Sequence, residues 1–216
     1  DDIRRGIQWV AAKFFFSNTE VETTQGERIS RSAFLSWIGM LAGGGLFGTL
    51  VYGFGNKYNY RVNKIPLAFK NIPSSFKGLK IAHISDIHSG SFTNKDAVLK
   101  GVQKILNEKP DLILFTGDLV NNKAEEMDDY IDVFSKLNAP LGVYSTLGNH
   151  DYADYVKWDD MDQNGFSVQK QQNLEALKKV HASMGWRLLL DENAELTMGD
   201  EKINLIGVQN ISGRGN

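Results

Sequence analysis

Apolar and polar positions divide the chain into a short N-terminal stretch, one long uncharged run and a region of short alternating elements. No charged residue occurs from Ala33 to Phe54, a run of 22 residues. As a helix rising about 1.5 Å per residue, this run matches a bilayer hydrocarbon core of about 30 Å. Trp37 and Tyr52 lie near its ends, where interfacial aromatic side chains are enriched. The pattern predicts a transmembrane helix over residues 33–55 after a polar and aromatic segment, 1–32; the alternative is a glycine-rich connector.

Glycine spacing within this run adds a second expectation. The pairs Gly39/Gly43 and Gly44/Gly48 have the small-xxx-small spacing that lets membrane helices approach closely, which predicts a helix–helix contact. Gly43-x-Gly45-x-x-Gly48 also matches the dinucleotide-binding fingerprint. That fingerprint requires a preceding strand and a surrounding βαβ unit, and neither is present, so we assign the match to chance.

Short apolar runs alternate with helical periodicity over residues 56–216, which we interpret as one domain. The pattern predicts strands over residues 80–85, 111–116, 141–146, 187–190, 194–198 and 202–208. It predicts helices over residues 94–108, 127–137 and 173–184. Apolar strands that alternate with helices are typical of a mostly parallel sheet covered on both faces. The fold class is therefore α/β.

Composition narrows the function classes. Of the 216 residues, 42% are apolar and 23% are charged, which is typical of a core-forming globule and excludes a disordered chain. The absence of cysteine excludes disulfide scaffolds, Cys-ligated zinc and thiol catalysis. A net charge of −2 predicts no nucleic-acid partner. Residues 57–80 carry six bases and no acid, which favours either contact with anionic lipid headgroups or a solvated strand and loop.

Polar clusters follow three of the predicted strands. Asp86 and His88 come after the first strand, Asp118 after the second, and Asn149 and His150 after the third. Carboxyl ends of parallel strands meet at one edge of a sheet, so these side chains should converge. Carboxylate, imidazole and amide oxygen suit Mn²⁺, Fe, Zn²⁺ or Mg²⁺. The clusters predict a divalent-metal site, although singly an aspartate could cap a helix and an asparagine could form a turn.

The trio Asp-x-His, Gly-Asp and Gly-Asn-His-Asp, spaced about thirty residues apart, resembles the calcineurin-like metallophosphoesterase superfamily. Residues 60–91 are similar to its membrane-associated bacterial branch. The resemblance implies a two-sheet sandwich, two divalent metal ions and phosphoester hydrolysis by a metal-activated hydroxide. The metal ligands that it implies are Asp86 and His88 for the first ion, Asp118 as a bridge between both ions, and Asn149 for the second ion.

The resemblance also assigns roles to two residues that follow Asn149. His150 would face the substrate and assist the leaving oxygen, and Asp151 would orient His150 through a hydrogen bond. The other two histidines lack ligand-spaced partners. We therefore expect His83 to lie in the core or on a sheet face, and His181 to serve in packing or lie at the surface.

The family completes its two metal spheres with further histidines downstream, one after a glycine and two in a Gly-His-x-His turn. The only histidine after His150 is His181, and its surroundings do not match. We therefore expect residues 1–216 to be a piece of a longer enzyme, a partial sandwich without the C-terminal metal-binding histidines. Weak metal binding by this piece is expected. The alternative function is a catalytically incomplete, membrane-anchored interaction module.

Substrate and location follow from the predicted span. The substrate class is a phosphomonoester, phosphodiester or pyrophosphate, and a tether beside a basic neck favours a lipid or envelope phosphoester. The expected location is a bacterial inner membrane. Bases on the neck side favour a cytoplasmic domain, whereas Ser30 to Leu35 resembles a degenerate twin-arginine signal and favours export. We favour the outer face.

Overall fold

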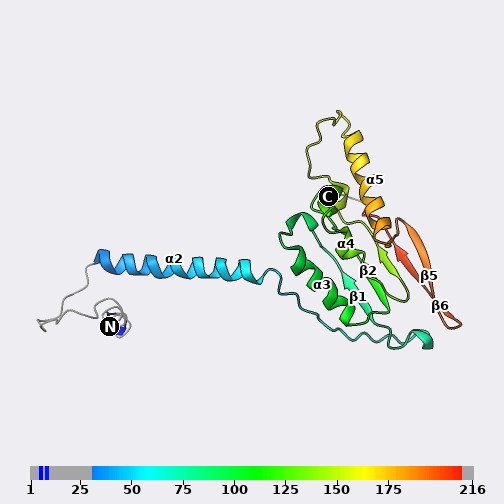
Figure 1. Cartoon of the computed structure of the whole chain (residues 1–216), viewed down its shortest axis with the longest axis horizontal. Coiled ribbons are helices and arrows are strands. Elements are labelled where there is room, and N and C mark those ends of the chain that lie inside the picture. Colours follow the sequence, from blue (N-terminus) through cyan, green and yellow to red (C-terminus); the bar gives the residue numbers. More distant parts are fainter. Residues whose placement is uncertain (1–4, 7, 10–30, 211–216) are drawn as a thin grey trace, which may run out of the picture. The chain divides into compact units, whose positions relative to one another are not determined.

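The computed structural model describes residues 5–6, 8–9 and 31–210, in two compact units divided between Asn56 and Lys57. One long helix, α2 (Arg31–Asn56, 26 residues), forms most of the described part of the first unit (Figure 1). None of its residues is buried against other parts of the chain. By length and composition α2 could cross a membrane, and the predicted span of residues 33–55 lies within it. The predicted segment of residues 1–32 falls mostly outside the described residues.

The second unit is built on a parallel four-stranded sheet in the order β1-β2-β3-β4 (Figure 1). Because Ile84 pairs with Phe115, and Phe115 with Ser145, the first three strands end at the same level. The central strand is almost wholly buried, as its continuous apolar sequence predicts. The predicted α/β class with a mostly parallel sheet is confirmed. The strands are β1 (Ile81–Ile84), β2 (Leu112–Phe115), β3 (Val143–Ser145) and β4 (Arg187–Leu188).

Helices flank this sheet, and two of them depart from the predicted bounds. Helix α3 (Lys95–Asn107) begins after Asn94, whose side chain accepts the Ala97 N–H at 3.0 Å. Helix α5 (Val168–Ser183) begins five residues earlier than predicted, because the Ser167 hydroxyl caps it by accepting the Lys170 N–H. The predicted helix over residues 127–137 is broken into a 3₁₀ turn, η3 (Ala124–Met127), and a short α4 (Ile131–Phe134). Tyr130 interrupts it with a non-helical φ of −122°.

The core lies against the sheet and is extended by an antiparallel hairpin. Phe115 of β2 packs on Trp186, with ring centroids 5.3 Å apart, beneath the end of the strand. The hairpin joins β5 (Glu192–Met198) to β6 (Glu201–Gly207), and Leu196 packs with Phe76 and Leu112 in a second apolar cluster. This packing fixes the strand ends from which the candidate site is built.

Candidate metal centre

The loops that follow β1, β2 and β3 are joined by backbone hydrogen bonds beyond the ends of the strands. The Asp86 N–H donates to the Gly117 carbonyl at 3.1 Å, and the His88 N–H donates to the Asp118 carbonyl at 3.0 Å. The sheet pairing therefore continues into the loops. It holds the first two predicted clusters side by side, as expected for the carboxyl edge of a parallel sheet.

Three of the predicted site residues have left-handed backbone conformations. The φ angles are 54° at Asp86, 47° at His88 and 60° at Asp118. Such angles are uncommon for residues other than glycine, and they are found mainly where the surrounding structure and function require them. The loops are therefore shaped to aim these side chains at a cost in local backbone energy.

Two glycines let the second and third loops touch through their backbones. A Cβ atom on Gly117 would lie 2.2 Å from the Gly148 nitrogen, and one on Gly148 would lie 2.2 Å from Asp118 Oδ1. Any side chain at either position would push the loops apart. The glycines of Gly-Asp and Gly-Asn-His-Asp thus allow the third loop to meet the Asp118 carboxylate.

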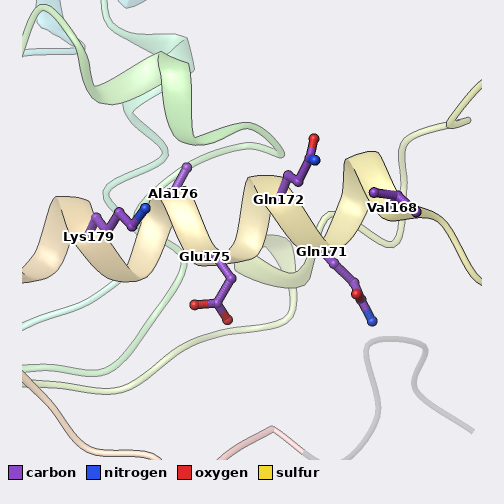
Figure 2. A pocket seen from close by; sticks show the side chains of 6 residues that line it. All are labelled: Val168, Gln171, Gln172, Glu175, Ala176 and Lys179. Atoms are coloured by element: carbon purple, nitrogen blue, oxygen red, sulfur yellow. The ribbon is translucent and has the colours of Figure 1, made fainter.

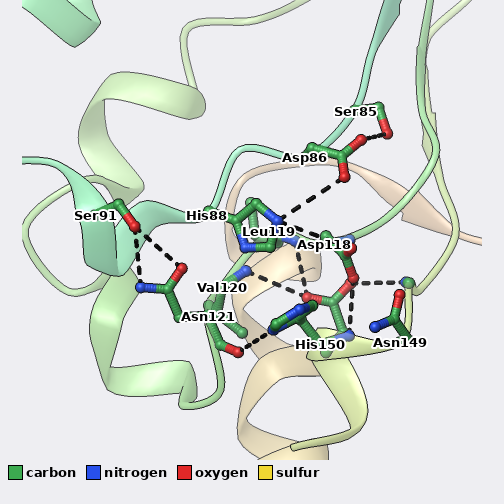
Figure 3. A network of polar contacts seen from close by, with 12 residues as sticks. Ser85, Asp86, His88, Ser91, Asp118, Leu119, Val120, Asn121, Asn149 and His150 are labelled. Atoms are coloured by element: carbon green, nitrogen blue, oxygen red, sulfur yellow. Dashed lines mark hydrogen bonds and ion pairs between the residues drawn. The ribbon is translucent and has the colours of Figure 1, made fainter. Parts of the chain in front are cut away.

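His88, Asp118 and His150 form a cluster whose ligand atoms lie within 4.8 Å of one another (Figure 3). His88 Nε2 is 3.9 Å from an oxygen of Asp118 and 3.9 Å from an oxygen of Asp86. The His88 and His150 rings meet edge to face, with centroids 4.8 Å apart. Half-buried imidazoles beside carboxylates are a donor set that fits a divalent cation. The structure thus brings together Asp86, His88, Asp118 and His150, with Asn149 beside them in Figure 3.

Asp151 points away from this cluster and into the protein. It is fully buried, and its carboxylate accepts N–H groups from Asp118, Leu119, Val120 and Gly148 at 2.8, 2.8, 3.3 and 2.9 Å. Burial raises the pKa of Asp151 to about 6, while the four N–H donors oppose that rise. Its contacts tie the second loop to the third, which differs from the hydrogen bond to His150 that the resemblance implied.

The polar partner of the His150 ring is a backbone carbonyl. His150 Nδ1 lies 2.7 Å from the Asn121 carbonyl oxygen (Figure 3). A carbonyl can only accept, so Nδ1 carries the proton and Nε2 is left for another partner. The His150 N–H donates to Asp118 Oδ1 at 2.8 Å, which fixes the residue at a second point.

Glu126 holds the loop that presents this carbonyl. Its carboxylate accepts the N–H groups of Asn121, Asn122 and Lys123 at 2.6, 3.0 and 2.9 Å. Sequence reasoning missed both Asn121 and Glu126, because a backbone carbonyl leaves no mark in a sequence. The one available signal was a glutamate three residues after the start of a helical turn, the position of a capping-box acid.

Tyr155 is a further neighbour that the motifs did not predict. Its hydroxyl accepts a hydrogen bond from Asn149 Nδ2 at 2.9 Å. Its ring lies against the His150 ring, with centroids 4.7 Å apart and planes tilted by 33°. It follows the third motif on an exposed loop, where no periodicity or spacing distinguishes it.

The two remaining histidines lie apart from the cluster. His83 is exposed on β1, and its Nε2 is 2.8 Å from the Thr116 hydroxyl. His181 is fully buried against Phe115 and Trp186, and burial lowers its pKa to about 4. A sheet-face position for His83 and a packing role for His181 agree with the expectations from the sequence.

A shallow pocket elsewhere on the surface lacks this chemistry. It runs along one side of α5 (Figure 2) and contains none of the clustered donors. Its side chains offer amides and single charges from one helix, so the strand-end cluster is the better candidate site. The pocket is lined by Val168, Gln171, Gln172, Glu175, Ala176 and Lys179.

The model of the calcineurin-like phosphoesterase family matches residues 79–208, a range that includes every strand and the whole cluster. The chain belongs to this family, whose members use divalent metals. The family assignment drawn from the three motifs is thereby confirmed.

Relatives place the family match among bacterial and membrane proteins. UDP-2,3-diacylglucosamine pyrophosphatase LpxG of Chlamydia trachomatis is 45% identical over 94 residues, covering 41% of this chain and 28% of that protein. The uncharacterized metallophosphoesterase YkuE of Bacillus subtilis is 37% identical over 137 residues, covering 60% and 47%. A transmembrane protein with metallophosphoesterase domain of Danio rerio is 27% identical, covering 62% and 30%. The chain thus spans between about a quarter and a half of the length of these relatives.

Proposed function

We propose that the protein is a membrane-tethered phosphoesterase that depends on two divalent cations. The observation that carries this proposal is the convergence of His88, Asp118 and His150 at the carboxyl edge of the sheet, inside the family match. Helix α2, which has no charged residue after Arg31, supports the tether. The Danio rerio relative is named as a transmembrane protein, which also supports a membrane tether.

The proposed ligands follow the three loops. Asp86 and His88 would hold the first ion, Asp118 would serve both ions, and Asn149 would hold the second. The 3.9 Å separations of His88 from the two carboxylates support a shared site. Bound Mn²⁺, Fe, Zn²⁺ or Mg²⁺ would polarise a phosphoryl group and lower the pKa of a water molecule. Residues 1–216 contain no further histidine in the spacing of the family's downstream metal ligands. The four proposed ligands are therefore part of the ligand set that the family uses.

His150 is suited to the proton transfer. Because Nδ1–H is bound to the Asn121 carbonyl, a proton arriving at Nε2 makes the ring cationic while the ring orientation is retained. A cationic Nε2–H can stabilise phosphoryl charge and then donate its proton to the departing oxygen. Asp151 supports this step indirectly, since it fixes the backbone on both sides of the cluster.

The favoured substrate is a lipid-linked pyrophosphate, of the kind named for the Chlamydia trachomatis relative. A catalytic domain tethered to a bilayer meets lipid substrates at high effective concentration. The six bases without an acid over residues 57–80 would also favour an anionic lipid surface. Hydrolysis of UDP-2,3-diacylglucosamine at the pyrophosphate would give UMP and a lipid phosphate.

The proposed location is the outer face of a bacterial inner membrane. The basis is the pattern of Ser30 to Leu35 at the start of α2, which resembles a twin-arginine signal with one arginine lost. Protease added to unlysed spheroplasts should cleave the domain of residues 57–216. Protection until the cells are lysed would place the domain in the cytoplasm instead.

A second candidate function is a non-catalytic, membrane-anchored interaction module. One observation favours it, namely that the four histidines of the chain leave no candidates for the downstream ligands. In that case the glycine faces of α2 would carry the binding. Among the residues that the structure describes, a Cβ placed on Gly39 or Gly43 meets nothing within 4 Å, which leaves room for a partner helix.

The variant Asp118→Asn distinguishes the proposed enzyme from the non-catalytic interaction module. The protein from its full reading frame, purified in detergent, should hydrolyse p-nitrophenyl phosphate or its bis-ester only with added Mn²⁺, and Asp118→Asn should lower kcat by at least about 100-fold. Asp200→Asn, exposed in the β5–β6 turn, is the matched control. Equal hydrolysis by the Asp118→Asn and parent proteins would contradict the proposed mechanism.

A separate assay tests the substrate class. UDP-2,3-diacylglucosamine in mixed micelles should release UMP with a higher kcat/KM than UDP-glucose, because binding energy from the acyl chains would be used in the transition state. Equal kcat/KM values for the two substrates would show that the phosphoesterase does not select for the lipid. That result would reject the lipid proposal and retain the enzyme.

A further inference from the structure

We propose that Tyr155 is a positioning residue that sets the orientation of the Asn149 amide toward the cation. This inference rests on the proposed function, because it concerns one of the proposed ligands. It assigns a role to a residue that lies outside the three motifs and six positions after Asn149. The observation is the hydrogen bond from Asn149 Nδ2 to the Tyr155 hydroxyl, 2.9 Å long.

An asparagine side chain can present either of two groups to a neighbour. Its oxygen can bind a cation, whereas its NH₂ group is a donor and cannot. In the structure the Tyr155 hydroxyl accepts a hydrogen bond from Nδ2 of Asn149, which leaves Oδ1 of the amide available to a cation. Residues that hydrogen-bond to a metal ligand generally orient that ligand and raise the affinity of the site for the metal.

Local structure explains how Tyr155 reaches this place. The short turn η4 (His150–Tyr152) ends at Ala153, which is fully buried and has a left-handed φ of 55°. The chain therefore reverses directly after the third motif. The Trp158 indole N–H donates to the Ala153 carbonyl at 3.3 Å and closes the turn. Tyr155 is thereby returned toward Asn149 and His150.

The ring and the hydroxyl of Tyr155 contact different neighbours. The ring lies 4.7 Å from the His150 ring, centroid to centroid, and the hydroxyl contacts Asn149. Tyr155→Phe removes the second contact and retains the first. A role limited to covering His150 would therefore survive this substitution, whereas orientation of Asn149 would not.

The experiment is a Mn²⁺ titration by calorimetry on the full protein in detergent. Tyr155→Phe should weaken Mn²⁺ binding by about tenfold, the lower end of the range for the loss of a hydrogen bond to a metal ligand. Tyr152→Phe is the matched control, since it removes from the same turn a hydroxyl that contacts Gln209, 3.4 Å away, and the Asn210 backbone. The melting temperature of each variant is measured alongside, because loss of one exposed hydroxyl should leave it within a few degrees of the parent.

A double-mutant cycle with Asn149→Ala makes the test specific. In the Asn149→Ala background, Tyr155→Phe should have no further effect on Mn²⁺ affinity, because the amide that it orients is gone. If Tyr155→Phe binds Mn²⁺ as tightly as the parent while Asn149→Ala weakens binding, the positioning role is wrong and the proposed enzyme stands. Equal, independent losses from Tyr155→Phe in both backgrounds also overturn the positioning role. If Asn149→Ala and Asp118→Asn both leave Mn²⁺ binding unchanged, the proposed metal site itself fails.

Discussion

The two sides of the candidate metal centre differ in how they are held. On the inner side, Asp118 is 9% exposed and Asp151 is fully buried, and both accept backbone hydrogen bonds. On the outer side, the Asp86 side chain is 66% exposed, and Tyr155 is 55% exposed. The inner side is therefore fixed by buried backbone hydrogen bonds, whereas the outer side is held by fewer contacts that are exposed to solvent.

This difference separates stability from ligand binding. Substitutions on the inner side should unfold or loosen the loops, because they leave buried N–H groups without acceptors. Substitutions on the outer side should leave the fold intact and act on the cation alone. The outer side therefore allows cation binding to be measured with little change in stability, whereas on the inner side Asp118 combines both roles.

The largest expected effect is that of Asp151→Ala. Removal of the carboxylate leaves four buried backbone N–H groups without their acceptor, which should lower the free energy of unfolding by about 4 kcal/mol. Hydrogen exchange is the measurement, because the amides of Asp118, Leu119 and Val120 should lose most of their protection. Asp151→Asn keeps one acceptor oxygen and should lose about half as much. Unchanged protection in Asp151→Ala would show that the loops are held by other contacts.

The parts of this arrangement that are local in sequence could be predicted. Each motif follows an apolar run directly, so strand ends, sheet class and the convergence of Asp86, His88, Asp118 and His150 follow from periodicity and the geometry of parallel sheets. The predicted ligand roles remain predictions.

The parts that depend on side chain to backbone contacts across loops could not be predicted. The family resemblance implied a hydrogen bond between Asp151 and His150, whereas in the structure the Asp151 carboxylate, in the turn η4, accepts N–H groups of another loop. The Asn121 carbonyl and the Glu126 carboxylate meet their partners only once the loops are folded. The prediction of one helix over residues 127–137 was wrong for a similar reason. The apolar residues of this segment reach the core from two separate short elements, η3 and α4.

Protonation of His181 at acid pH should destabilise the core that lies beneath the inner side of the site. His181 lies 3.0 Å from the Ser145 hydroxyl at the end of β3, and burial lowers its pKa to about 4 from 6.5. The unfolded chain therefore binds a proton more readily than the folded one, so stability is complete above pH 6.5 and falls as the pH drops to 4. The contribution of His181 to this loss should reach about 3 kcal/mol at pH 4, at about 1.36 kcal/mol per pKa unit. The raised pKa of Asp151 acts in the opposite direction, because the folded protein binds a proton at this carboxylate more readily than the unfolded chain does.

Urea unfolding between pH 4 and 7 measures this loss. His181→Gln cannot ionise, so between pH 7 and pH 4 its stability should fall by about 3 kcal/mol less than that of the parent. The matched control is His83→Gln on the exposed face of β1, which should leave the acid-induced loss in place. If the parent and His181→Gln proteins have the same pH dependence of stability from pH 7 to pH 4, His181 is not held neutral by burial.

The smallest expected effect on stability, and the sharpest contrast, is that of Asp86→Asn. Asparagine tolerates the left-handed φ of 54° and keeps the size of the side chain, and the position is exposed, so the free energy of unfolding should change by less than about 0.5 kcal/mol. The carboxylate charge near His88 is lost, so Mn²⁺ affinity should fall by at least about tenfold. Calorimetric titration and urea unfolding of the same sample give both values. A large loss of stability in Asp86→Asn would place Asp86 with Asp118 and Asp151 on the rigid side, whereas retained stability with weakened Mn²⁺ binding would show that the outer side serves the cation.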